Sequence, residues 1–219
     1  MWRASVSVSV VVVSALILWG CSQTPQFIAK DEPWRADEER ACLASGYVRQ
    51  SPFLTTRAAL GGPSVCGALQ PFEMTGAAQG RVTMKPAAML RCPMIPAIER
   101  WVETVVEPAA RYHLGVPVTE IKVAASYGCR AMNHQRGARL SEHGHANALD
   151  VSGFQLADGR TITLKSGWNG DQRERDFLRS VHTGACRHIT TVLGPDYNRL
   201  HHDHFHLDLM RRGSGNVCK

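Results

Sequence analysis

The chain has 219 residues and a mass of 24.1 kDa, enough for one ordinary domain with a small addition. Hydrophobic residues make up 44% of the sequence and charged residues 20%, which suits a packed core with a solvated surface and excludes wholesale disorder. The net charge is +6, and the basic residues form no stripe interleaved with aromatic residues. This pattern argues against nucleic acid as a partner and is compatible with an anionic wall polymer or a membrane surface.

Residues 1–20 resemble a secretory signal. Arg3 precedes an apolar run over residues 6–18, which is too short to span a bilayer comfortably. The Leu-Trp-Gly-Cys motif that ends at Cys21 resembles a bacterial lipobox, in which the cysteine becomes the lipidated first residue. We therefore predict a lipoprotein signal peptide, a membrane anchor at Cys21 and, because Ser22 follows, a periplasmic location at the outer membrane. Simple cleavage to a soluble exported protein is the alternative.

The mature chain divides by composition into three parts. Residues 21–40 are polar and mixed in charge, which predicts a tether. Residues 41–98 are punctuated by glycine and proline and predict short strands and loops wrapped onto a main domain over residues 99–219. Apart from Cys21, the cysteines are even in number and widely spaced, so they predict three structural disulfides with 15 possible pairings; they are Cys42, Cys66, Cys92, Cys129, Cys186 and Cys218.

Hydrophobic periodicity predicts an α+β fold with an antiparallel sheet and flanking helices. A helix is expected from Pro96, ended or kinked by Pro108, and a second helix is expected over residues 173–193. The expected strands cover residues 118–127, 148–156, 160–164 and 203–210, with a turn at Asp158-Gly159. The sequence contains neither a G-x-G-x-x-G motif nor a Walker loop, which argues against a nucleotide-binding fold.

Six of the ten histidines fall in two short windows: His143 and His145, then His201, His202, His204 and His206. If the second window is a strand, the side chains of His204, His206 and Asp208 share one face, while Phe205 and Leu207 point to the core. Two imidazoles and a carboxylate suit a zinc ion with an open position for water.

The first window supplies the carboxylate. Six residues separate His143 from Asp150, about the length a loop needs to return an imidazole beside the next strand. The alternative is an exposed loop over residues 201–206 that binds metal non-specifically, but apolar and polar residues are not expected to alternate in such a loop. The isolated histidines are interpreted as ordinary hydrogen-bonded side chains; they are His113, His134, His182 and His188.

The pattern S-x-H-(six residues)-D, followed far downstream by H-x-H, resembles the zinc peptidases of the lysostaphin, D-Ala-D-Ala carboxypeptidase and hedgehog (LAS) group. The stretch from His201 to His206 is similar to that of penicillin-insensitive murein endopeptidases. From about Cys42 to Cys218 the chain is similar to the bacterial extensin-like C-terminal family. The resemblance implies a LAS-type zinc peptidase fold stapled by disulfides.

The resemblance also implies residue roles. His143, Asp150 and His206 would bind zinc, and His204 would handle protons or stabilise the oxyanion. Arg130 matches an arginine that grips a substrate carboxylate, and Ser141 would lie behind the ligands; His201 and His145 are candidates for lining the cleft. Independently of the resemblance, the position of Asp208 beside the histidines predicts an acceptor that orients an imidazole.

The expected function is zinc-dependent hydrolysis of peptidoglycan peptides. H-x-H in place of the carboxypeptidases' E-x-W-H favours an endopeptidase, without fixing which bond is cut. A non-catalytic zinc-containing module that binds peptidoglycan is the main alternative. A secreted disulfide-rich domain with only adventitious metal binding is a third hypothesis. Serine or cysteine hydrolase chemistry is disfavoured, because no G-x-S-x-G motif and no free thiol are expected.

Overall fold

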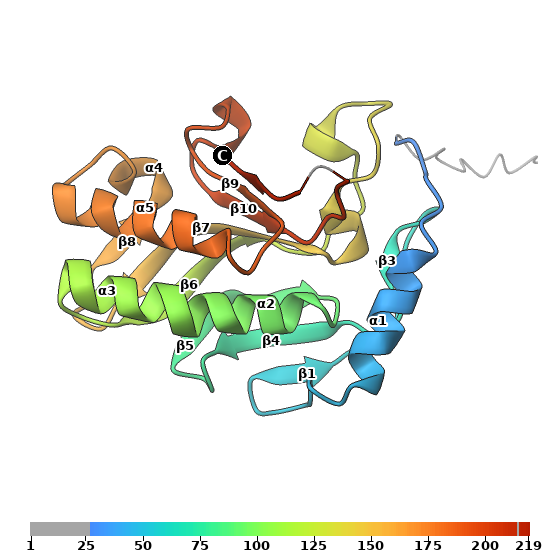
Figure 1. Cartoon of the computed structure of the whole chain (residues 1–219), viewed down its shortest axis with the longest axis horizontal. Helices are drawn as coiled ribbons and strands as arrows, with labels where there is room; N and C mark the ends of the chain where they lie inside the picture. The colour runs from blue at the N-terminus through green and yellow to red at the C-terminus, as the bar shows by residue number, and fades with distance from the viewer. Residues whose placement is uncertain (1–26, 214) are drawn as a thin grey trace, which may run out of the picture.

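The computed structural model describes residues 27–213 and 215–219 (Figure 1). The predicted signal peptide, the predicted lipidation at Cys21 and the first part of the predicted tether lie outside these residues. Within the described part of the chain, no helix is both long enough and apolar enough to cross a membrane.

The described chain is mixed α/β. Its α-helices are α1 (Trp34–Ala44), α2 (Met94–Trp101), α3 (Glu107–Leu114), α4 (Leu164–Gly167) and α5 (Gln172–Ala185). A π-helical segment, η1 (Val102–Val106), joins α2 to α3, and the 3-10 turns are η2 (Met132–His134), η3 (Glu142–His145) and η4 (Arg199–His201).

Strands in the described residues form one large sheet and one small hairpin. The strands are β1 (Leu54–Thr56), β2 (Leu60–Gly61), β3 (Gly67–Ala68), β4 (Phe72–Ala77), β5 (Val82–Leu90), β6 (Val118–Ala125), β7 (Ala148–Leu156), β8 (Thr161–Thr163), β9 (Thr191–Leu193), β10 (Phe205–Asp208) and β11 (Val217–Cys218). The sheet order is β1-β4-β5-β6-β7-β10-β9-β11, with β8 also pairing with β7, while β2 and β3 pair with each other.

The large sheet is mostly antiparallel, as predicted. Two pairs of neighbouring strands are parallel: β5 with β6, and β9 with β11. The first pair needs a crossover, because parallel neighbours cannot be joined by a tight turn. The continuous helical stretch from α2 through α3 provides that crossover between β5 and β6.

Two helical segments, α2 through α3 and α5, pack side by side over the same side of the sheet (Figure 1). Trp101 and Phe177 each meet the ring of Phe154 edge to face, at centroid distances of 6.3 and 5.2 Å. The helices approach closely at Gly184, where an added Cβ would lie 2.3 Å from Val105 Cγ1. This side of the sheet is therefore the hydrophobic core.

The structure differs from the predicted domain boundaries. Residues 34–40, predicted as tether, belong to α1, and the predicted boundary at 98/99 falls inside α2. The segment 41–98 is not a separate wrap, because β4 and β5 belong to the same sheet as β6 and β7. Hydrogen bonding across the sheet thus joins the parts that composition separates.

Two predicted helices also differ from the observed ones. Pro108 does not end the helical stretch: it lies in the first turn of α3, directly after η1, where the backbone changes from π-helical to α-helical hydrogen bonding. The second helix ends at Ala185 instead of continuing to residue 193, and Val192 belongs to strand β9. A strand of three residues is too short to show a period of its own in the sequence.

The six predicted structural cysteines are all paired in the described chain. The disulfides are Cys42–Cys92, Cys66–Cys129 and Cys186–Cys218. The first attaches α1 to the residues before α2, and the third attaches the last strand to the end of α5. Three disulfides are thus confirmed, and the structure selects one pairing from those the sequence left open.

Replacing both Cys186 and Cys218 by alanine is expected to lower the free energy of unfolding by about 3 to 4 kcal/mol, because the bridge closes a loop of 32 residues. Urea denaturation followed by circular dichroism measures this change. An unchanged transition midpoint would show that the terminal strand β11 is held by its hydrogen bonds alone.

Candidate metal centre

Asp150 and His206 are direct cross-strand partners. They lie opposite each other in the antiparallel pair β7–β10, next to the partners Val151 and Phe205. Phe205 points to the helical side, where its ring meets Trp168 at 5.8 Å. Side chains alternate along a strand, so Asp150 and His206 project away from that contact. Their side chains meet, with His206 Nδ1 2.8 Å from Asp150 Oδ1.

His143 reaches the same point from η3, the turn before β7. The chain turns back at Ala146, whose φ of 51° lies in the left-handed region. The buried ring of His143 donates from Nδ1 to the carbonyl of Ser126, since a carbonyl can only accept. Nε2 is therefore left with its lone pair, 3.1 Å from Asp150 Oδ2. This contact lacks hydrogen-bond geometry, so Nε2 has no hydrogen-bond partner among the described residues.

Potential ligand atoms of His143, Asp150 and His206 all lie within 4.8 Å of one another. These three residues are the candidate metal site. Nε2 of His206 lies 2.8 Å from Asp208 Oδ2, so Nδ1 is the nitrogen that faces Asp150. Two imidazole nitrogens and one carboxylate fit zinc, and a carboxylate behind a ligating histidine is its usual support.

The charges of the site are strongly coupled. Burial disfavours a charge on Asp150, but the neighbouring imidazoles of His143 and His206 outweigh it and hold the pKa of Asp150 well below its usual range. Burial likewise opposes the His206 cation, but hydrogen bonds to Asp150 and Asp208 raise the pKa of His206 to about 9. Two carboxylates thus flank His206, and this concentration of negative charge suits a bound cation.

His204 lies beside the candidate metal site. Its Nδ1 is 2.9 Å from Asp203 Oδ1, and its Nε2 is 3.9 Å from Asp150 Oδ2. Asp203 therefore orients the ring and leaves Nε2 directed at the site. His201 is buried next to it, with ring centroids 5.3 Å apart. Burial and the neighbouring histidines lower the pKa of His201 to about 4, so its ring is neutral at physiological pH.

A cleft of about 570 Å³ opens onto these residues. Its lining includes the predicted Arg130, Ser141, His201 and His204, together with all three residues of the candidate metal site. Two further arginines line the cleft, Arg139 and Arg212, and so do Tyr197 and Leu200. The structure thus places most of the sequence-predicted site residues around one cavity.

Residues 40–219 match the family model described as extensin-like protein C-terminus. The chain belongs to the extensin-like C-terminal family. No curated protein and no solved structure matches the chain. In this extensin-like domain the matched region contains the candidate metal site and all six paired cysteines, whereas residues 27–39 lie outside it.

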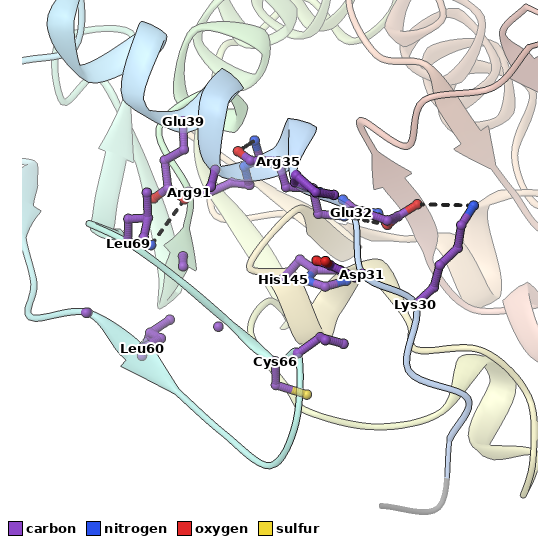
Figure 2. Close-up of a pocket in the computed structure, with 16 residues that line it drawn as sticks. Lys30, Asp31, Glu32, Arg35, Glu39, Leu60, Cys66, Leu69, Arg91 and His145 are labelled. Carbon is purple, nitrogen blue, oxygen red and sulfur yellow. Dashed lines mark hydrogen bonds and ion pairs between the residues drawn. The ribbon is translucent and has the colours of Figure 1, made fainter.

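His145 does not line the cleft of this extensin-like domain, contrary to the prediction. It lies in a separate pocket of about 380 Å³ between α1 and the β2–β3 hairpin, as Figure 2 shows. The reason is local: η3 is a 3-10 turn with about three residues per turn, so residues two apart point in different directions. Burial and nearby Arg35 lower the pKa of His145 to about 4.

Several contributors to the site carry no sequence signal. Ser126 acts through its backbone carbonyl, so its residue type reveals nothing. Arg139 and Arg212 come from segments before η3 and after β10, and only folding brings them to the same cleft. Asp208 was expected to orient an imidazole, and it contacts His206 directly.

Proposed function

We propose that this protein is a zinc-dependent peptidase that hydrolyses peptide bonds in peptidoglycan. The observation that carries the proposal is the convergence of His143, Asp150 and His206, with a buried nitrogen of His143 left unpaired beside the Asp150 carboxylate. Three protein ligands are typical of a catalytic zinc site, which keeps a further position open. The resemblance to LAS-type zinc peptidases supports the same three ligands and a LAS-type fold.

When bound, zinc would lower the pKa of water to about 7 and polarise the scissile carbonyl. The chain supplies the proton transfer. His204 has Nδ1 fixed by Asp203, so Nε2 can accept a proton during attack and return it to the leaving amine. Asp208 keeps His206 oriented by bonding its outer nitrogen. His201, neutral and buried, adds a hydrogen-bonding group to the cleft wall.

The cleft favours an anionic peptide. Its acidic residues are already engaged: Glu142 with Arg35, and Asp150 and Asp208 with histidines. Arg130, Arg139 and Arg212 form no ion pair among the described residues and line the cavity. The peptides of peptidoglycan carry free carboxylates, which arginine binds well. Endopeptidase action is preferred to carboxypeptidase action because the His201–His206 stretch resembles murein endopeptidases.

The proposed location is the periplasm, with a lipid anchor at Cys21. The three disulfides support an oxidising compartment, since such bonds rarely persist in the cytosol. The lipobox-like motif supports the anchor, and its final Ser22 favours the outer membrane.

Dialysis against a strong chelator is expected to abolish muropeptide release from purified sacculi, and Zn²⁺ is expected to restore it. Mass spectrometry of the released fragments measures cleavage and identifies the bond. Cleavage that survives complete metal removal would refute the proposal. Sacculus binding at stoichiometric zinc without any released fragment would favour the non-catalytic binding module instead.

A further inference from the structure

The N-terminal helix α1 is joined to the turn that carries His143 by a largely buried ion pair. Arg35 donates two hydrogen bonds to the carboxylate of Glu142, at 2.8 and 2.6 Å. The side chains are 12% and 2% exposed, and 107 positions separate them in the sequence. Glu142 directly precedes His143, so this contact lies one residue from a candidate ligand.

Hydrogen bonds hold the η3 turn at both of its ends. Glu142 also accepts a hydrogen bond from the Asn147 side chain, which closes the turn on itself. At the other end, the backbone N–H of Arg91 donates to the carbonyl of Ala146 at 2.8 Å. The Arg91 guanidinium donates in turn to the carbonyl of Arg35 at 3.1 Å. His143 thus lies on a short turn clamped between two points.

The clamp is anchored to the rest of the fold. The Cys42–Cys92 disulfide ties α1 to the residue that follows Arg91. In Figure 2, Arg35 and Arg91 lie next to each other along α1, above His145. Arg35 also bonds Glu32 at 2.7 Å, which fixes its guanidinium before it reaches Glu142. The guanidinium of Arg35 is therefore held in one orientation, with its two terminal nitrogens directed at Glu142.

Stability alone does not account for a buried pair of this kind. Taking two charges out of water costs about as much as their attraction returns, and hydrophobic replacements of similar volume are often neutral or stabilising. A bidentate arginine–carboxylate pair does impose a fixed geometry. What the pair supplies is the position of the η3 backbone, and with it the position of His143.

We propose that Arg35 is a positioning residue that, through Glu142, fixes His143 for metal binding. The inference rests on the proposed zinc site and extends it to α1. Arg35 lies outside the residues that match the family model, so the support comes from a segment that the family region does not include. On this proposal, α1 contributes to the metal centre indirectly, through the contact of Arg35 with Glu142.

The decisive variant is Arg35→Met combined with Glu142→Gln. It removes the link without leaving a lone buried charge, so its thermal midpoint is expected to stay near that of the wild type. Its zinc affinity, measured by competition with a chromophoric chelator, is expected to fall about 10-fold, the lower end of the range for residues that orient ligands. The absorption spectrum of the Co²⁺-loaded protein is expected to change, because it reports ligand geometry.

Arg40→Ala is the matched control. Arg40 is on the same helix and pairs with Asp37 at an exposed position, so zinc affinity and spectrum should not change. A double variant with wild-type zinc affinity and a wild-type Co²⁺ spectrum would overturn the inference.

If the double variant does not fold, the single variant Arg35→Lys tests whether Arg35 positions His143. Lysine keeps the cation but not the fork, so weaker zinc binding at an unchanged thermal midpoint supports positioning, and wild-type affinity overturns it. A wild-type protein that binds no zinc would instead refute the proposed function itself, which separates the two failures.

Discussion

Alanine in place of His206 is expected to abolish stoichiometric zinc binding and peptide hydrolysis together. His206 supplies one of three ligands, and its loss also leaves the carboxylates of Asp150 and Asp208 facing each other without the imidazole between them. The loss of affinity should exceed the roughly 10- to 100-fold typical of residues that only orient a ligand. Metal analysis of protein purified without a histidine tag measures the first effect, and muropeptide release measures the second.

His202→Ala is the matched control for this variant. His202 lies in the same window, but its side chain is 57% exposed and bonds the backbone carbonyl of Arg199. It should retain zinc and activity. Full zinc occupancy in His206→Ala would contradict the assignment of His206 as a ligand and would leave metal binding to the remaining histidines of the cleft.

The second large effect is expected for His204→Ala, which should keep its zinc but lose turnover. Nε2 of His204 lies 3.9 Å from Asp150 Oδ2, beside the candidate metal site but outside the set of converging ligand atoms. Removing a general acid–base group lowers kcat by about 10²- to 10⁴-fold. Zinc content and kcat measured on the same preparation separate the two roles.

Two results would contradict this role for His204. Zinc lost together with activity would make His204 a ligand. Activity retained in full would mean that proton transfer runs through another group, such as His201, 5.3 Å away between ring centroids. The double variant His201→Ala/His204→Ala would then identify that group.

The sequence predicted the parts of the site that depend on local periodicity. The strand predicted over residues 148–156 matches β7 to the residue, and alternation in the second histidine window predicted the strand β10, whose His206 the structure places opposite Asp150. The loop length between His143 and Asp150 was enough to anticipate their meeting. These features are local because a strand's side-chain direction is set by its own backbone.

The remaining features depend on long-range contacts. Strand β9 was predicted as helix because Ile189 and Val192 fit a helical period, whereas its pairing with β10 and β11 decides its structure. His145 and His143 look equivalent in the sequence, but the geometry of η3 directs their side chains into different cavities. The contact of Arg35 with Glu142 spans 107 positions and leaves no pattern in the sequence.

The position of β11 links the last disulfide to the cleft. β10, which carries His206, pairs with β7 on one side and with β9 on the other, and β9 is bordered in turn by β11. Thr191 of β9 and Val217 of β11 are cross-strand partners, and both line the cleft. The Cys186–Cys218 disulfide therefore holds part of the cleft wall in place as well as the strand itself.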